Sequence, residues 1–149
     1  MPVLVSSIDM ALAYFDSPSD IVRRMMEQHW PGALTIVAHC KKDLIYSPIC
    51  AGGTTVGLRM PNHTVPLSII EAVGVPILGP SANFHGEPTP YEQENLNQEL
   101  IRLVDLVVLG ECLAERDPAS PDTVKQASTV VDCSIEPYKI LRQGAVQLT

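Results

Sequence analysis

The sequence predicts an α/β fold in which helices pack on a mixed β-sheet. Runs rich in β-branched residues, which are typical of strands, are interspersed with segments that carry apolar residues at helical spacing. The two kinds of segment do not alternate strictly, which argues for a mixed sheet rather than an all-parallel one. The chain has 149 residues and is 46% apolar, which is enough for a single domain with its own core.

The first part of the chain contains two predicted strands with two predicted helices between them. Pro2–Val5 has the composition of a strand, and Ser7 is placed to cap a short helix. Ser17–Asp20 begins a second helix, which carries one apolar stripe and ends near Trp30. Ala33–Cys40 is rich in β-branched residues and is therefore predicted to be a strand.

The middle of the chain continues the sheet. Leu44–Ile49 is a candidate partner strand, and Thr54–Met60 is a further strand that a proline ends. Residues 64–73 are predicted to form a helix, which Gly74 closes in the left-handed conformation. The apolar run Val75–Leu78 is predicted to be a buried strand.

The last part of the chain supplies the remaining elements. Tyr91–Arg102 is predicted to be helical, and Val104–Leu109 is predicted to be another buried strand. Glu111–Ala127 is polar and contains prolines, so it is expected to be a loop. Ser128–Cys133 and Tyr138–Leu141 are the last two predicted strands.

Bulk properties bound the function classes. The net charge of −7 disfavours a nucleic-acid binder, so direct tRNA contact is not predicted. No apolar run approaches the roughly 20 residues of a membrane helix, and the N-terminus does not resemble a signal peptide. The cysteines at 40, 50, 112 and 133 have no zinc-site spacing, and Cys40 and Cys133 are predicted to be buried thiols. These features together predict a cytoplasmic protein without a protein-bound metal.

The loop Gly79–Pro90 is the first candidate binding element. It combines two glycines and three prolines with the neutral polar side chains of Ser81, Asn83 and Thr89. It follows a predicted strand, and such loops bind ligands in open α/β sheets. A surface turn with ordinary side-chain caps is the alternative interpretation.

Arginine and hydroxyl side chains at strand ends are the second candidate feature. Arg59 and Arg142 each end a predicted strand, and a guanidinium in such a setting calls for an anionic partner. Ser128 and Thr129 open another strand, where their hydroxyls could bind a ligand or cap an edge. Together these strand ends suggest an anion-binding pocket, although a salt bridge is an equal alternative for Arg59. The sequence contains neither a P-loop nor a G-x-G-x-x-G motif.

Several motifs, taken in chain order, carry a resemblance to a known family. They are Trp30–Thr35, Thr55–Pro61, Gly79–Asn83 with Gly86, Pro88 and Thr89, Ser128–Asp132, and Ile140–Ala145. This set resembles the YrdC family, the L-threonylcarbamoyladenylate synthases of tRNA modification. The S-A-N-x-x-G and S-T-V-V-D elements are the most specific parts of the resemblance.

The resemblance implies a twisted α/β sheet around a central cavity that binds ATP, L-threonine and bicarbonate. The products would be threonylcarbamoyl-AMP and pyrophosphate, with ATP used as its Mg²⁺ complex. The product would pass to tRNA threonylcarbamoyl-transfer proteins for modification of tRNA position 37. Residue by residue, the resemblance implies an ATP site of Thr55, Ser81, Thr89 and Arg142, a threonine site of Arg59, Gly79 and Ser128, and a loop ordered by Asn83.

One part of the family pattern is missing. Family members carry an N-terminal P-T-D-T-x-Y-G-L-like segment and a K-x-R pair before a strand that Pro2–Val5 resembles, so this domain is expected to be truncated relative to the family. A misplaced start codon, a deliberately shortened chain and a natural paralogue are the three explanations. The alternatives for function are a non-catalytic nucleotide- or RNA-binding paralogue and a carbamoyl-transfer domain with a different acceptor.

Overall fold

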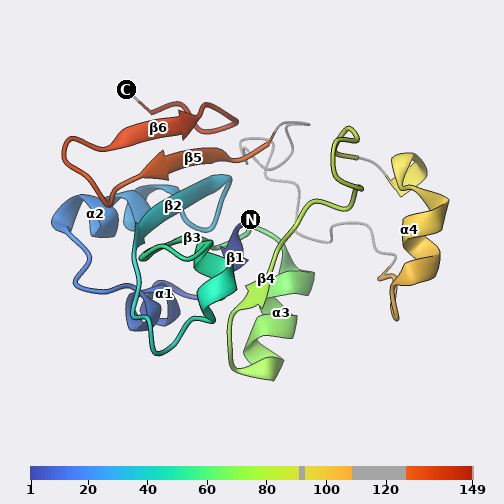
Figure 1. The fold of residues 1–149 in the computed structure, drawn as a ribbon, viewed down its shortest axis with the longest axis horizontal. Coiled ribbons are helices and arrows are strands. Elements are labelled where there is room, and N and C mark those ends of the chain that lie inside the picture. The colour runs from blue at the N-terminus through green and yellow to red at the C-terminus, as the bar shows by residue number, and fades with distance from the viewer. Residues whose placement is uncertain (91–92, 109–126, 149) are drawn as a thin grey trace.

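The computed structural model of the protein describes residues 1–90, 93–108 and 127–148. These residues form a six-stranded sheet, four α-helices and two short 3₁₀ helices (Figure 1). The strands are β1 (Val3–Leu4), β2 (Leu34–His39), β3 (Thr55–Arg59), β4 (Ile77–Leu78), β5 (Thr129–Asp132) and β6 (Lys139–Arg142). The helices are α1 (Ile8–Tyr14), α2 (Asp20–His29), α3 (Thr64–Val73) and α4 (Gln98–Leu103), with 3₁₀ turns at Ser47–Cys50 and Gln93–Asn95.

The sheet is mixed, as the sequence predicts. Its strand order is β4-β1-β3-β2-β5-β6. β1 runs parallel to β3 and β2 runs parallel to β5, whereas the β1–β4, β2–β3 and β5–β6 pairs are antiparallel. The antiparallel pair β2–β3 joins the two parallel pairs, so strands from both ends of the chain meet in the middle of the sheet.

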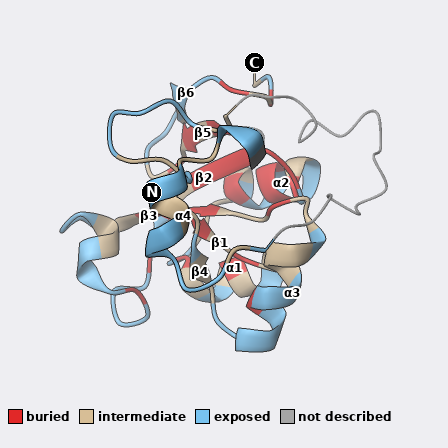
Figure 2. Ribbon diagram, turned by 90° about the vertical axis from the view of Figure 1, so that its right-hand side faces the viewer, coloured by how far each residue is buried: buried red, intermediate tan, exposed pale blue. Residues whose placement is uncertain are grey.

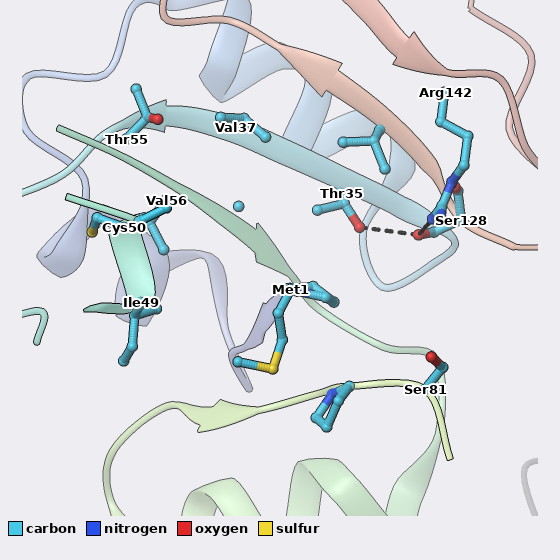
Figure 3. A pocket seen from close by; sticks show the side chains of 15 residues that line it. Met1, Thr35, Val37, Ile49, Cys50, Thr55, Val56, Ser81, Ser128 and Arg142 are labelled. Carbon is cyan, nitrogen blue, oxygen red and sulfur yellow. Dashed lines mark hydrogen bonds between the residues drawn. The ribbon is translucent and has the colours of Figure 1, made fainter. Parts of the chain in front are cut away.

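The two faces of the sheet have different surroundings. Helices α1 and α2 pack against one face and enclose the hydrophobic core. The other face is hollowed by a cavity into which side chains of β2, β3 and β5 point (Figure 3). Burial is concentrated in β2, β5 and α2, whereas α3 and α4 are largely exposed or half-buried (Figure 2).

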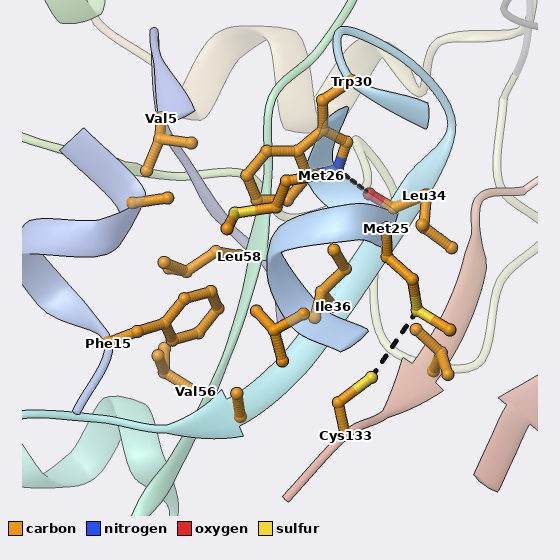
Figure 4. Packing of buried hydrophobic residues seen from close by; sticks show 14 of the residues in the cluster. Val5, Phe15, Met25, Met26, Trp30, Leu34, Ile36, Val56, Leu58 and Cys133 are labelled. Atoms are coloured by element: carbon orange, nitrogen blue, oxygen red, sulfur yellow. Dashed lines mark hydrogen bonds between the residues drawn. The ribbon is translucent and has the colours of Figure 1, made fainter. Parts of the chain in front are cut away.

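The core side chains come from alternate strand positions and from the inner sides of α1 and α2. Met25 and Met26 of α2 pack near Leu34 and Ile36 of β2, as Figure 4 shows. The indole Nε1 of Trp30 donates a hydrogen bond to the Leu34 carbonyl oxygen at 2.8 Å, which ties the end of α2 to the start of β2. Burial of the large apolar side chains is the main source of stability here.

The predicted helix ends are confirmed with one qualification. Ser7 caps α1, because its hydroxyl accepts the Met10 N–H at 3.0 Å. Gly74 ends α3 with φ of 77°, the left-handed conformation predicted for it. Ser19 occupies the N-cap position of α2, but its hydroxyl makes no capping hydrogen bond.

Two strand predictions are wrong, and the helix predicted over Tyr91–Arg102 is divided. Leu44–Ile49 forms no strand; instead Ser47–Cys50 is a 3₁₀ helix, whose first turn accommodates Pro48. Val104–Leu109 was expected to be buried, yet among its described residues Leu106 is 77% exposed and none is in a strand. Within Tyr91–Arg102, the described helical residues are the 3₁₀ turn Gln93–Asn95 and the helix α4. Tyr91 lies outside the described residues.

The strand at Val75–Leu78 is present but is not buried. β4 consists of Ile77 and Leu78, and it lies at the edge of the described sheet, where it pairs with β1. Val75 and Leu78 are exposed because no further strand or helix covers this edge among the described residues. An apolar run therefore predicted the strand correctly, while its place in the sheet decided its burial. The loop predicted over Glu111–Ala127 lies outside the described residues, apart from Ala127.

Candidate active site

Alternation along the central strands separates core residues from cavity residues. In β2, Leu34 and Ile36 face the helices, and Thr35 and Val37 face the cavity. The same period of two applies in β3, where Thr55 and Gly57 line the cavity, and from Ser128, just before β5, to Val130. Val56 is the exception, because it belongs to the core and also contributes to the lining. The open face of the sheet therefore presents hydroxyl groups among small and apolar side chains.

The cavity has a volume of about 490 Å³, which is in the range of small-molecule sites. The loop after β4 contributes Pro80 and Ser81, and the N-terminus contributes Met1 and Pro2. Figure 3 shows Thr35, Ser128 and Arg142 at one end of the cavity, with Thr55 and Cys50 at the other. Among the described residues that line it, Arg142 is the only one with a cationic side chain.

Arg142 is held in place by Ser128. Its Nε donates to the Ser128 carbonyl oxygen at 3.0 Å, and its Nη2 donates to Ser128 Oγ at 3.1 Å. Ser128 Oγ lies 3.1 Å from Thr35 Oγ1, so a continuous polar chain links Thr35 of β2, Ser128 just before β5 and Arg142 of β6. A guanidinium fixed by two hydrogen bonds needs little reorganisation to meet an anionic ligand.

Thr129, the neighbour of Ser128, has a structural role. Its side chain is fully buried on the opposite face, where Oγ1 donates to the Val146 carbonyl oxygen at 2.6 Å. Thr129 Oγ1 also accepts hydrogen bonds from the N–H groups of Gly144 and Val146, at 2.9 and 3.1 Å. Gly144 packs so closely on the backbone of Ala127 and Ser128 that a side chain there would collide with it. Of the two adjacent hydroxyls, one therefore faces the cavity and the other fixes the segment after Arg142.

The loop after β4 approaches the sheet through Gly79. The Gly79 N–H donates to the Pro2 carbonyl oxygen at 3.0 Å, and a Cβ at Gly79 would lie 2.6 Å from Leu4 Cγ. A side chain at this position would force the Leu4 side chain to move, so glycine lets the loop run close to β1. Two residues further on, Ser81 lines the cavity. Further along, Asn83 Nδ2 donates to the carbonyl oxygens of Phe84 and Glu87 at 3.0 Å each and closes the turn.

The structure brings part of the predicted site together. Thr55, Ser81, Ser128 and Arg142 line the cavity, whereas Gly79, Asn83 and Thr89 are not among the lining residues. Arg59 ends β3 on the strand face of Thr55, but it does not line the cavity either. The Arg59 Nε donates to the Gly32 carbonyl oxygen at 2.9 Å.

Sequence reasoning assigned no role to Thr35 or Gly57, which also line the cavity. The missing Cβ of Gly57 would lie 3.3 Å from Thr35 Cγ2, so glycine leaves room for the threonine side chain. The alternation of Leu34, Thr35 and Ile36 is a signal that could have placed Thr35 on the cavity side. Which of the two faces remained open could not be read from the strand alone.

Cysteine thiols lie beside and beneath the site. The Cys40 and Cys50 sulfurs are 3.5 Å apart, and Cys50 lines the cavity. Burial, reinforced by the hydrogen bond with Cys50, raises the pKa of Cys40 to about 11. Burial also raises the pKa of Cys133 to about 11, with a smaller contribution from the adjacent Asp132 carboxylate. Cys40 and Cys133 are buried, as predicted.

Metal-binding clusters and membrane-spanning helices are both absent from the described ranges. Those residues contain no group of three or more His, Cys, Asp or Glu side chains that could hold a metal ion. None of the helices in the same ranges has the length and apolar character needed to cross a membrane.

Comparison with known proteins places the chain in a family. The Sua5/YciO/YrdC family model, whose description reads "Telomere recombination", matches residues 1–144. Over 124 residues the chain is 34% identical to the threonylcarbamoyl-AMP synthase of Bacillus subtilis, covering 83% of this chain and 33% of that protein. It is 30% identical to the threonylcarbamoyl-AMP synthase of Pyrococcus abyssi, again covering 83% of this chain and 34% of that protein.

Solved structures agree with this placement. The structure of P. abyssi Sua5 complexed with L-threonine matches with a TM-score of 0.83 and 25% identity, over 96% of this chain and 39% of that chain. Escherichia coli YciO shares the fold, with a TM-score of 0.77 and 22% identity over 96% of this chain and 65% of that chain. The chain spans about a third of the length of the two synthases named above. From its sequence match and its fold, this chain belongs to the Sua5/YciO/YrdC family.

Proposed function

We propose that this domain forms L-threonylcarbamoyl-AMP and pyrophosphate from ATP, L-threonine and bicarbonate. The observation that carries the proposal is the convergence of side chains from four separate segments on one cavity. These residues are Thr55, Ser81, Ser128 and Arg142. Hydroxyl groups can donate to and accept from polar substrates, and a guanidinium neutralises phosphate. The similarity to proteins named threonylcarbamoyl-AMP synthase supports the same reaction.

The proposed reaction has two bond-forming steps. The amino nitrogen of threonine first bonds to the carbon of bicarbonate, and water leaves. An oxygen of the resulting carbamate then attacks the α-phosphorus of ATP, and the bond to the bridging oxygen of the β-phosphate breaks, so that pyrophosphate leaves. ATP enters as its Mg²⁺ complex. Fixed donors and a fixed cation beside the phosphates would stabilise the charge of the transition state.

We assign the nucleotide to Thr55, Ser81, Thr89 and Arg142. Arg142 supports this assignment most directly, because its guanidinium is already oriented by Ser128 at the cavity wall. Thr55 and Ser81 line the same cavity from β3 and from the loop after β4. Thr89 is exposed further along that loop, so its contact would depend on how the loop meets the nucleotide.

We assign L-threonine to Ser128, the backbone of Gly79 and the guanidinium of Arg59. Ser128 is buried at the cavity wall, and Gly79 directly precedes the cavity-lining residues Pro80 and Ser81. Arg59 would bind the threonine carboxylate as a bidentate donor. The proposed part of Asn83 is to keep the Gly79–Pro90 loop in shape through its two side-chain hydrogen bonds.

The product would be passed to tRNA threonylcarbamoyl-transfer proteins that modify tRNA position 37. Transfer between proteins suits an activated, short-lived acyl adenylate, because the acyl group must reach its acceptor before water attacks it. The acidic net charge of −7 gives no support to direct tRNA binding by this chain.

The decisive experiment is pyrophosphate release by the 149-residue chain. Release from MgATP is expected only when L-threonine and bicarbonate are both present, with threonylcarbamoyl-AMP identified by mass spectrometry. Pyrophosphate release that does not depend on threonine would contradict the proposal. Nucleotide binding without any release would instead identify a non-catalytic nucleotide-binding paralogue.

Two substitutions test the assigned residues. Arg142→Gln is expected to lower turnover by about 10²- to 10³-fold, the usual cost of one oriented donor to a charged transition state. Arg24→Gln, on the exposed side of α2, removes the same charge away from the cavity and is the matched control. Arg59→Ala is expected to abolish threonine binding without unfolding the protein, and unchanged binding by calorimetry would refute its role.

A further inference from the structure

Three polar residues are buried among the described residues, and two of them line the cavity. Thr35 is 4% exposed, Ser128 is 8% exposed and Thr129 is fully buried. The three hydrogen bonds of Thr129 explain its burial, since they hold the segment after β6. The hydroxyls of Thr35 and Ser128 instead meet each other at the cavity wall, 3.1 Å apart. This buried pair is hydrogen-bonded and also lines the cavity, so its hydroxyl groups are placed where a ligand can meet them.

Packing directs the Thr35 hydroxyl toward Ser128. Thr35 is β-branched, so its χ1 angle is restricted to few rotamers. Its methyl group Cγ2 lies against Gly57 of β3, at 3.3 Å from the position that a Cβ would occupy. Because β3 and β5 flank β2 on opposite sides, the methyl lies toward β3 and the hydroxyl toward β5. The side chain is therefore oriented without help from a ligand.

The hydroxyl protons of Thr35 and Ser128 determine what this pair can donate to the cavity. The Arg142 guanidinium has donors only, so Ser128 Oγ must accept the hydrogen bond from Nη2. Thr35 and Ser128 together carry two hydroxyl protons, and the hydrogen bond between them uses one. If Thr35 is the donor, Ser128 Oγ accepts twice and its own proton must point elsewhere. The cavity that Ser128 lines is the place available for that proton.

We propose that Thr35 is a positioning residue: its hydroxyl donates to Ser128 Oγ and thereby turns the Ser128 proton toward an acceptor oxygen of bound L-threonine. This inference rests on the function proposed above, in which Ser128 contacts threonine. It adds that Thr35 of β2 makes Ser128 a hydrogen-bond donor to the ligand, so that Ser128 favours an acceptor oxygen over a donor group. Arg142 supports the same arrangement by occupying the second lone pair of Ser128 Oγ.

A double-mutant cycle tests the action of Thr35 through Ser128. Thr35→Val keeps the shape and removes the hydroxyl, and it is expected to weaken L-threonine binding about 3- to 10-fold by calorimetry. ATP binding is expected to change by less than about twofold, and Thr35→Ser is expected to restore threonine binding. In the Ser128→Ala background, Thr35→Val is expected to cause no further loss. Equal losses of both ligands, or the same threonine loss in both backgrounds, would overturn the proposal.

A second measurement does not depend on threonine binding. Neutron diffraction from deuterium-exchanged crystals of the ligand-free chain would locate the two hydroxyl deuteriums directly. A deuterium on Thr35 Oγ1 that points to Ser128 Oγ supports the proposal, and one on Ser128 Oγ that points to Thr35 overturns it. If the unmodified chain binds no threonine in calorimetry, the proposed function fails on that result, while the neutron density still decides how the pair is oriented.

Discussion

Removing the Thr129 hydroxyl is expected to be among the more destabilising conservative changes in this protein. Valine has nearly the shape of threonine, so Thr129→Val leaves no cavity on the buried side of β5. It does leave the N–H groups of Gly144 and Val146 without their acceptor. Each buried donor left unsatisfied costs about 1–3 kcal/mol. The Val146 carbonyl oxygen also loses the hydrogen bond from Thr129, but it keeps the one from Gln143 Nε2, so its contribution to the loss of stability is smaller.

The sum predicts a loss of about 3 kcal/mol in the free energy of unfolding, or a melting temperature lower by about 6–12 °C for a chain of this length. Urea denaturation followed by circular dichroism measures it. Thr129→Ser is the control, because it keeps the hydroxyl and gives up one methyl, at about 1 kcal/mol. If the valine variant is no less stable than the serine variant, the hydroxyl does not hold the Gly144–Val146 segment and the argument fails.

Two further predictions concern the same region and the buried thiols. Gly144→Ala places a Cβ against the Ala127 and Ser128 backbone, so we expect a loss of about 1–3 kcal/mol in urea denaturation together with weaker ligand binding; wild-type stability would refute the close packing. Because burial raises the pKa of Cys40 and Cys133 from 9.0 to about 11, the unfolded chain loses these protons first. The two protonated thiols therefore contribute fully to the free energy of unfolding below pH 9.0, and this contribution is lost as the pH rises to about 11. The urea concentration at the unfolding midpoint should fall over that pH range, and it should fall less in Cys133→Ala.

Features of the fold that depend on local chemistry could be predicted from the sequence. The Ser7 cap depends on a hydroxyl beside a nearby N–H, and the end of α3 depends on the freedom of Gly74 to adopt positive φ. Both effects act within a few residues. They need no knowledge of distant partners, and both predictions are confirmed.

Burial could not be predicted in the same way, because it depends on what covers a segment. Val75–Leu78 and Val104–Leu109 are both rich in apolar and β-branched residues. Val75–Leu78 contains the exposed edge strand β4. The described part of Val104–Leu109 is in no strand and is largely exposed. The Leu44–Ile49 prediction failed for a local reason, since Pro48 suits a 3₁₀ turn better than a paired strand. Burial of the two apolar segments is therefore decided by neighbours that are distant in the sequence, and the 3₁₀ turn is decided by the single residue Pro48.

The candidate site shows the same division. Motif resemblance and strand-end chemistry pointed to Ser81, Ser128 and Arg142, and the structure brings all three to one cavity. Thr35 was overlooked because its significance depends on Ser128, which lies 93 residues further along the chain. Its buried position at the β2–β5 boundary became visible only with the strand pairing.

The parallel pairing of β2 with β5 also has a consequence for how the molecule forms. Leu34 is in register with Thr129, so the centre of the sheet closes a loop of more than ninety residues. Contacts this remote in sequence form slowly, because the chain entropy of closing the loop is lost before the contacts stabilise it. A nascent chain that has not yet reached Thr129 leaves one edge of β2 unpaired and open to other strands. The residues from Ser128 onward therefore complete both the described sheet and the cavity wall.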